Sequence, residues 1–212
     1  MRIPVLLFHD VLCAYCTVAS ARLSALEQEF ADTLHVTPRP YPLRPLEARP
    51  SDKELKRLAR HVRSVAKLPE GAGYSSSVWI GGDPPCSSTP PLVALEAALL
   101  QGEEAQRRML ERLRAVAFRG GMNIARRDVI LEVAGAVGLD MPRFVTAFDS
   151  QAATRAVELA HRSAIAHGVQ ALPAVVFGDE WLITGVREVG EYRDALLRWL
   201  GRYTSQPVRV VH

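Results

Sequence analysis

Two cysteines, Cys13 and Cys16, stand three positions apart directly after a short apolar run. That run, residues 3–9, is too short for a helix and is typical of a buried strand. From there to residue 30 the apolar residues recur at helical spacing, so Cys13 should lie at a helix N-terminus. Unpaired N–H groups and the positive end of the helix dipole favour a thiolate there, the form that attacks disulfides. Cys16, one turn further on, can resolve a mixed disulfide.

Two other interpretations of this cysteine pair stay open. Cys-x-x-Cys is half of a zinc site, and Cys86 and His9 are conceivable further ligands, although Cys86 stands far away in the sequence. The two thiols can also pack as inert small hydrophobes. A disulfide-stapled secreted domain would carry more than three cysteines, and in even number. The sequence therefore favours reactive cysteines and predicts no metal.

The elements after the first helix are expected to be mainly helical. Residues 34–41 predict a second strand, which Pro38 and Pro40 confine to an edge. Ser51 opens a capping box that begins a helix, and the prolines and glycines of residues 68–91 indicate a long loop. Apolar stripes predict further helices over residues 92–99, 110–117, 130–137, 144–148 and 151–167.

The period of the apolar residues changes near the end of the chain. Residues 174–177 and 181–184 read as two strands of a hairpin, and Pro173 opens the first of them. A last helix follows, with Tyr192, Leu196 and Trp199 turned inward. This element order predicts an α/β fold in which a helical insertion interrupts one sheet.

Composition excludes several classes of function. The 212 residues are 48% hydrophobic and 23% charged with a net charge of +3, so neither nucleic acid nor membrane is expected as the main partner. No apolar run approaches the roughly 20 residues that span a bilayer. The N-terminal apolar run ends after six residues, short of a signal peptide, so we expect a cytoplasmic protein. The oligomeric state is not indicated.

Three stretches, residues 8–16, 117–140 and 168–185, resemble the DsbA-like branch of the thioredoxin superfamily, particularly its cytoplasmic FrnE-like members. The resemblance covers nearly the whole chain and is weakest over residues 41–90. It implies a thioredoxin fold with an α-helical insertion domain. The expected boundaries are 1–45 and 169–212 for the thioredoxin-like domain and 46–168 for the helical insertion.

The resemblance also implies a site and an activity. It implies a cis bond at Leu172-Pro173, a loop there that faces Cys13, and a Leu172 backbone that pairs with an extended substrate. Ala14 and Tyr15, between the cysteines, are expected to contact substrate as well. The implied reaction is dithiol–disulfide exchange with protein or small-thiol substrates. No cofactor is implied, and glutathione is kept as a conceivable reductant.

The sequence departs from the family in the dipeptide between its cysteines. Ala-Tyr contains neither proline nor a histidine that would stabilise a thiolate, so a strongly oxidising potential is not expected. Ala174 also stands where the family often has a hydroxyl residue.

Two other functions remain as alternatives. Kappa-class glutathione transferases and 2-hydroxychromene-2-carboxylate isomerases share the fold and an Asp-x-x-[Cys/Ser] motif, here Asp10 to Cys13, but usually have serine in place of Cys13. The second alternative is a zinc-binding or redox-sensing protein without enzymatic activity. For Asp10 we expect the modest role of capping the first helix.

Overall fold

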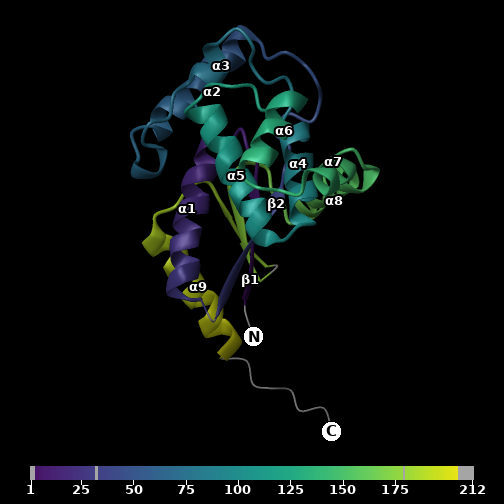
Figure 1. The fold of residues 1–212 in the computed structure, drawn as a ribbon. Helices are drawn as coiled ribbons and strands as arrows, with labels where there is room; N and C mark the ends of the chain where they lie inside the picture. The colour runs from purple at the N-terminus through teal and green to yellow at the C-terminus, as the bar shows by residue number, and fades with distance from the viewer. Residues whose placement is uncertain (1–2, 32, 179, 205–212) are drawn as a thin grey trace.

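The computed structural model describes residues 3–31, 33–178 and 180–204 (Figure 1). Within them one sheet has the strand order β2-β1-β3-β4. β1 pairs in parallel with β2 and antiparallel with β3, and β3 pairs antiparallel with β4. The strands are β1 (Ile3–His9), β2 (Leu34–Pro40), β3 (Ala174–Phe177) and β4 (Trp181–Thr184). The predicted α/β fold is confirmed, and β2 is the predicted edge strand.

The central strand β1 is apolar because helices cover both faces of the sheet. Val5 and Leu7 point to the face covered by α1 (Ala14–Glu29) and α9 (Val189–Thr204). Leu6 and Phe8 alternate with them and point to the other face, where Ala164 of α8 (Gln151–Ala166) packs. Tyr192, Leu196 and Trp199 of α9 are buried, as the sequence predicted.

The helical insertion gathers at the end of the sheet where β1 finishes (Figure 1). Its helices are α2 (Asp52–Val65), α3 (Ser77–Ile80), α4 (Thr89–Leu99), α5 (Glu103–Phe118), α6 (Arg127–Ala136), α7 (Met141–Phe148) and α8, with a 3-10 turn η1 (Pro69–Gly71). The N-cap of the predicted capping box is confirmed, because the Ser51 hydroxyl accepts a hydrogen bond from the Glu54 N–H at 3.3 Å, while the Glu54 carboxylate pairs with Arg44.

The prediction of a long loop over residues 68–91 is wrong in part. The segment contains η1, α3 and the first turn of α4. Trp79 of α3 is buried in the helical core, so tertiary packing holds a short helix that the sequence pattern does not indicate. Pro90 lies in the first turn of α4, where a missing N–H costs no hydrogen bond.

The core of the insertion extends to the start of α1. Val11, Leu12, Ala14 and Val18 belong to the same cluster of buried residues as the inner faces of α2, α4, α5, α6 and α7. The segment that carries the cysteines is therefore held by the sheet on one side and by the insertion on the other. The domain boundaries at 45/46 and 168/169 stay a prediction.

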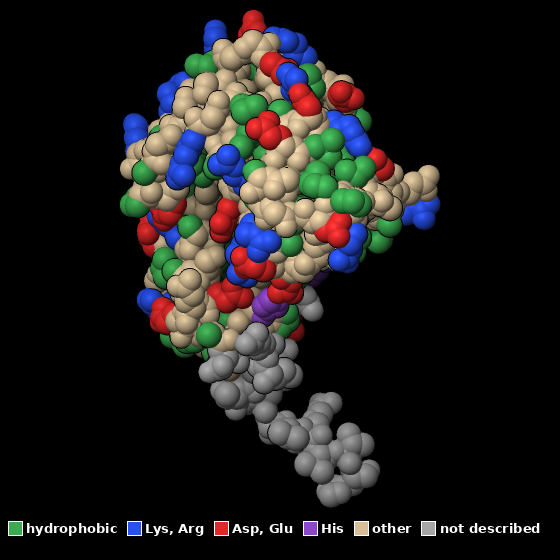
Figure 2. All heavy atoms as spheres, viewed as in Figure 1, with side chains coloured by type: hydrophobic (Ala, Val, Ile, Leu, Met, Phe, Trp, Pro, Cys, Tyr) green, Lys and Arg blue, Asp and Glu red, His purple; other side chains and the backbone are tan. Residues whose placement is uncertain are grey.

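A buried arginine joins α1 to two other parts of the chain. Arg22 donates to Glu70 of η1 at 2.6 Å, to Glu188 at 2.9 Å and to the Arg187 carbonyl at 2.8 Å. Most other charged side chains lie outside, and Figure 2 shows both signs interspersed over one face, in keeping with the small net charge of +3.

Replacing Arg22 should destabilise the protein strongly. Arg22→Ala leaves the carboxylate of Glu70 without its partner in a largely buried place, so we expect the free energy of unfolding to fall by about 3 kcal/mol. Urea unfolding of both proteins measures it. Arg193→Ala is the control, because the Arg193–Glu29 pair is exposed and its loss should change stability little. Equal losses in the two variants would contradict the role given to Arg22.

Candidate active site

The turn from β1 into α1 places the first cysteine at a helix N-terminus. Cys13 is the N-cap residue of α1, in an extended conformation with φ −89° and ψ 103°. Its Sγ accepts a hydrogen bond from the Cys16 N–H at 3.3 Å. The sulfur thus lies beside unpaired N–H groups and the positive end of the helix dipole, where negative charge is favoured. The predicted position of Cys13 in the fold is confirmed.

The two cysteines differ in access to solvent. Cys13 is 9% exposed and Cys16 is 0% exposed, and both are free thiols. Burial raises the pKa of the Cys16 thiol well above its usual value, and the neighbouring Cys13 raises it further. Cys13 is thus the more exposed residue of the pair, and Cys16 is fully buried and stays a thiol.

Asp10 holds the turn together and does not cap α1. Its Oδ1 accepts from the Leu12 N–H at 2.8 Å and its Oδ2 from the Leu43 N–H at 2.7 Å. The expectation that Asp10 caps the first helix was wrong, since the cap is Cys13 itself. Burial raises the pKa of Asp10 to about 6, and hydrogen bonds from Ser88 and the two N–H groups partly oppose that rise.

His9, the last residue of β1, is a neutral imidazole. It is buried, and its Nδ1 has no hydrogen-bond partner among the described residues. Burial first, and the charge of Arg114 second, lower the pKa of His9 to about 3. His9 therefore brings no positive charge to the cysteines at neutral pH.

Two residues near the site were missed at the level of sequence. Ser88 precedes α4 and hydrogen-bonds to Asp10 across a long stretch of chain, which no local pattern reveals. Arg114 of α5 is 4% exposed. A signal for Arg114 does exist, because it stands four residues after Leu110 and three before Ala117, at the spacing of the buried face.

The predicted cis bond at Leu172-Pro173 is confirmed. Ala174, the next residue, pairs with Phe8 of β1, so Pro173 lies beside the end of β1 that leads into the cysteine turn. The Pro173 carbonyl accepts from the Gly185 N–H at 2.8 Å, while Leu172 packs half-buried against the Phe8 cluster. Substrate binding by Leu172 and Pro173 stays a prediction.

The two residues between the cysteines differ in exposure. The side chain of Ala14 is buried in the helical core, while Tyr15 is half-buried. The Tyr15 ring lies against His61 of α2, with centroids 5.6 Å apart. Both remain predicted substrate contacts, and only Tyr15 offers partly accessible side-chain surface.

Further ligands for a metal do not gather at the cysteine pair in the part of the chain that is described. There, no three His, Cys, Asp or Glu side chains are placed to hold one ion. Cys86 lies in a separate loop, where its carbonyl accepts from Arg44 Nε at 3.4 Å. No helix among these residues is long and apolar enough to cross a membrane.

Residues 4–197 match the model of a protein family described as DSBA-like thioredoxin domain. The chain belongs to this family. The match spans the sheet and the helical insertion together, and the thioredoxin fold with an α-helical insertion is confirmed.

Several solved structures have the same fold. A candidate protein disulfide isomerase from Nitrosomonas europaea superposes with a TM-score of 0.82 at 17% identity, covering 95% of this chain and 99% of that one. The cytosolic disulfide reductase DsbM from Pseudomonas aeruginosa gives 0.71 at 24% identity, covering 94% and 99%. A 2-hydroxychromene-2-carboxylate isomerase gives 0.65 at 19% identity, covering 99% and 100%.

Curated sequence relatives carry the name ClpXP adapter protein SpxH. The Bacillus subtilis protein is 30% identical over 158 residues, which are 69% of this chain and 52% of the relative. The Halalkalibacterium halodurans protein is 31% identical over 123 residues, 58% and 40% of the two chains. The chain therefore spans about half the length of the curated relatives it matches.

The buried, neutral His9 should make stability depend on acid. Folded His9 stays neutral down to its pKa of about 3, whereas the unfolded chain binds a proton below 6.5, so acid favours unfolding in that window. Between about pH 7 and about pH 4 the free energy of unfolding of the wild type should fall by about 3 kcal/mol more than that of His9→Gln. Urea unfolding at both pH values measures this difference. Asp10 titrates in both proteins, so its contribution cancels in the difference between them. Wild type and His9→Gln whose free energies of unfolding fall equally with pH would contradict the prediction.

Proposed function

We propose that this protein is a thiol–disulfide oxidoreductase in which Cys13 is the catalytic nucleophile and Cys16 the resolving thiol. One observation carries the proposal: Cys13 caps α1 with its sulfur at the helix N-terminus, and the buried Cys16 follows within the first turn. The two half-reactions need a nucleophile and a resolving thiol close behind it, and the less buried Cys13 and the fully buried Cys16 suit these roles. Membership of the DSBA-like family supports the same chemistry.

The proposed reaction moves two electrons between sulfurs. The Cys13 thiolate attacks one sulfur of a substrate disulfide, a mixed disulfide forms, and the other substrate sulfur leaves as a thiolate. Cys16 then gives up its proton and attacks the Cys13 sulfur. The Cys13–Cys16 disulfide forms, the second substrate sulfur leaves, and both leaving thiolates take protons from solvent or from Cys16. The substrate is reduced and the protein is oxidised.

We further propose that the substrates are protein or small-thiol disulfides in the cytoplasm and that the reaction runs as a reduction or isomerisation. The backbone of Leu172 beside cis-Pro173 is the expected place for an extended substrate segment. Glutathione is the proposed reductant, with two molecules reducing the Cys13–Cys16 disulfide and leaving as one glutathione disulfide. The fold shared with a cytosolic disulfide reductase supports this direction.

Equilibration with glutathione buffers tests the proposal. After the thiols are trapped with an alkylating reagent, mass spectrometry should show Cys13 and Cys16 converting together between dithiol and disulfide. In Cys16→Ser the mixed disulfide at Cys13 should accumulate as an adduct of one glutathionyl group, because the resolving thiol is gone. The Cys13→Ser substitution should lower the rate of disulfide reduction at least about a hundredfold.

Cys86→Ser is the matched control, since Cys86 lies in another loop and should be dispensable. Wild-type protein that never forms a Cys13–Cys16 disulfide in any buffer would refute the proposed function. So would full disulfide reductase activity in Cys13→Ser.

A glutathione-dependent transferase or isomerase is the second candidate. The observation in its favour is the fold shared over the whole length of a 2-hydroxychromene-2-carboxylate isomerase. That chemistry activates glutathione without oxidising a cysteine pair, so it would survive in Cys16→Ser. Tight glutathione binding together with undiminished activity of that variant would favour it over disulfide exchange.

A protein-binding adapter is the third candidate, because the curated relatives at 30–32% identity carry that name. An adapter needs a stable complex with its partner and no cycling of its cysteines. Complex formation that is equal in wild type and in a Cys13→Ser, Cys16→Ser double variant would favour this function.

A further inference from the structure

A cavity of about 250 Å³ lies between α1, α5 and the 3-10 turn η1. This volume is several times the ~30 Å³ that one water molecule occupies in the liquid, so a small organic molecule can fit. Ser24, Glu111 and Arg119 line the cavity and are exposed, so it opens at the surface. Neither Cys13 nor Cys16 lines it, and the proposed disulfide exchange makes no use of it.

Buried polar atoms without a hydrogen-bond partner gather at this cavity. In the part of the chain that the structure describes, they include Thr17 Oγ1, Glu70 Oε2, and Nε and Nη2 of Arg114, and all three residues line the cavity. Oε1 of Glu70 accepts from Arg22 Nε at 2.6 Å, so Oε2 is the oxygen left over. Proteins leave few buried polar groups unpaired, because each unmade hydrogen bond is costly. Three such residues at one cavity indicate that a polar molecule fills it.

Arg114 of α5 is the lining residue that most needs a partner. It is 4% exposed, and no hydrogen bond or ion pair joins it to another described residue. The other arginine at the cavity, Arg119, is exposed and lies over the Tyr74 ring, 5.7 Å from its centroid. A guanidinium keeps its positive charge in proteins, and a buried charge without a partner is costly. A carboxylate matches both the charge of Arg114 and its planar set of donors.

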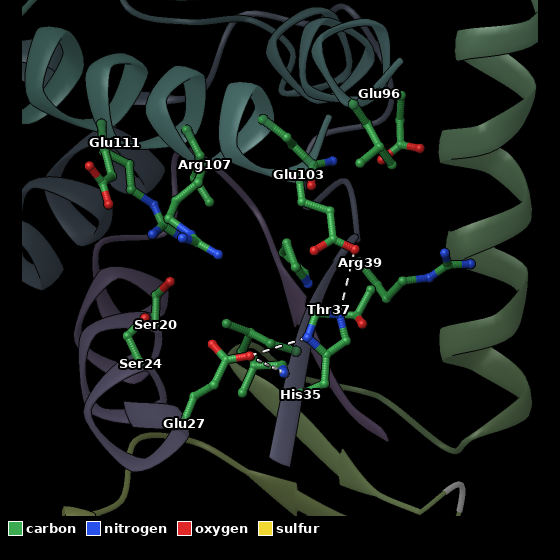
Figure 3. Close-up of a pocket in the computed structure, with 17 residues that line it drawn as sticks. Ser20, Ser24, Glu27, His35, Thr37, Arg39, Glu96, Glu103, Arg107 and Glu111 are labelled. Carbon is green, nitrogen blue, oxygen red and sulfur yellow. Dashed lines mark hydrogen bonds and ion pairs between the residues drawn. The ribbon is translucent and has the colours of Figure 1, made fainter. Parts of the chain in front are cut away.

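A second cavity, of about 140 Å³, shares Arg114 with the first. Figure 3 shows His35 of β2 there, between the carboxylates of Glu27 and Glu103. His35 lies 3.3 Å from Glu27 and 3.5 Å from Glu103. These side chains have partners within the chain, whereas neither cavity supplies one for Arg114 among the described residues.

The atoms at the larger cavity require an occupant with both kinds of charge. It has to accept hydrogen bonds from Arg114 and donate one to Glu70 Oε2. A doubly charged anion such as phosphate is disfavoured, since the carboxylates of Glu70 and Glu111 line the same cavity and would repel it. The hydroxyl groups of Thr17 and Ser20 can bind either kind of group. A carboxylate and an ammonium group on one small molecule meet all of these requirements.

We propose that this cavity binds a small amino acid, with its carboxylate on Arg114 and its ammonium group toward Glu70 and Glu111. The inference goes beyond the proposed function, because the site lies apart from the cysteines and requires no redox step. The exposed residues at the opening admit the ligand directly, and the buried Arg114 receives its carboxylate further inside.

Three matched probes test the class of ligand. L-alanine carries both charges, propionate lacks the ammonium group, and ethylamine lacks the carboxylate. In NMR titrations of the wild type at constant pH and ionic strength, L-alanine should bind saturably, with one molecule per chain. Propionate and ethylamine should bind at least about tenfold more weakly, because each leaves one charged group of the cavity unpaired.

Substitutions at the cavity test the residues. Arg114→Met should weaken L-alanine binding at least about tenfold. Thr17→Val removes a hydroxyl group and keeps the shape, so it should weaken binding about fivefold, and it keeps the test open if Arg114→Met does not fold. Arg112→Met is the matched control on α5, because Arg112 is exposed and lines neither cavity. Cys13→Ser should bind L-alanine as the wild type does.

Three outcomes would overturn the proposal. The first is a wild type without saturable L-alanine binding, in which case the cavity holds water alone. The second is propionate binding as tight as that of L-alanine, since the ammonium group would then play no part. The third is unchanged affinity for L-alanine in folded Arg114→Met or, where that variant does not fold, in Thr17→Val. Each leaves the cysteine chemistry untouched, which equilibration with glutathione buffers tests separately.

Discussion

The buried carboxyl group of Asp10 fixes the turn that carries Cys13. It binds the N–H of Leu12 in the turn and the N–H of Leu43 in the loop after β2. These two hydrogen bonds determine where the chain leaves β1 and where α1 begins, and so they determine where Cys13 lies. Ser88 completes the arrangement from the start of α4. Strand, loop and insertion thus meet at one carboxyl group next to the cysteines.

The parts of this arrangement that depend on local sequence could be predicted. The apolar run of β1, the helical spacing after Cys13 and the capping box at Ser51 each act over a few residues, and all three were found. The helix α3 was missed because Trp79 is held there by side chains distant in sequence. The partner of Asp10 in the loop at Leu43 was missed for the same reason, since a single sequence does not show which N–H group will be near.

The charge balance of the site is also a property of the tertiary structure. Taken alone, the residues around Cys13 look poorly suited to hold negative charge, since Ala14 and Tyr15 are neutral. The fold adds a helix N-terminus from α1, and burial keeps His9 uncharged. The two residues between the cysteines therefore do not by themselves determine how well the site holds a negative charge on sulfur.

The core that the turn shares with the insertion has a consequence for how the substrates of the proposed reaction would approach. Val11, Leu12, Ala14 and Val18 pack within the same apolar cluster as the insertion helices. A hinge that swung the insertion away from the sheet like a lid would expose this cluster to water, at a free-energy cost that grows with the apolar area uncovered. The shared core therefore opposes separation of the two parts around Cys13. In the proposed reaction, conformational adaptation would then fall to the substrate, and flexible or locally unfolded polypeptide segments would be favoured over disulfides held inside rigid domains.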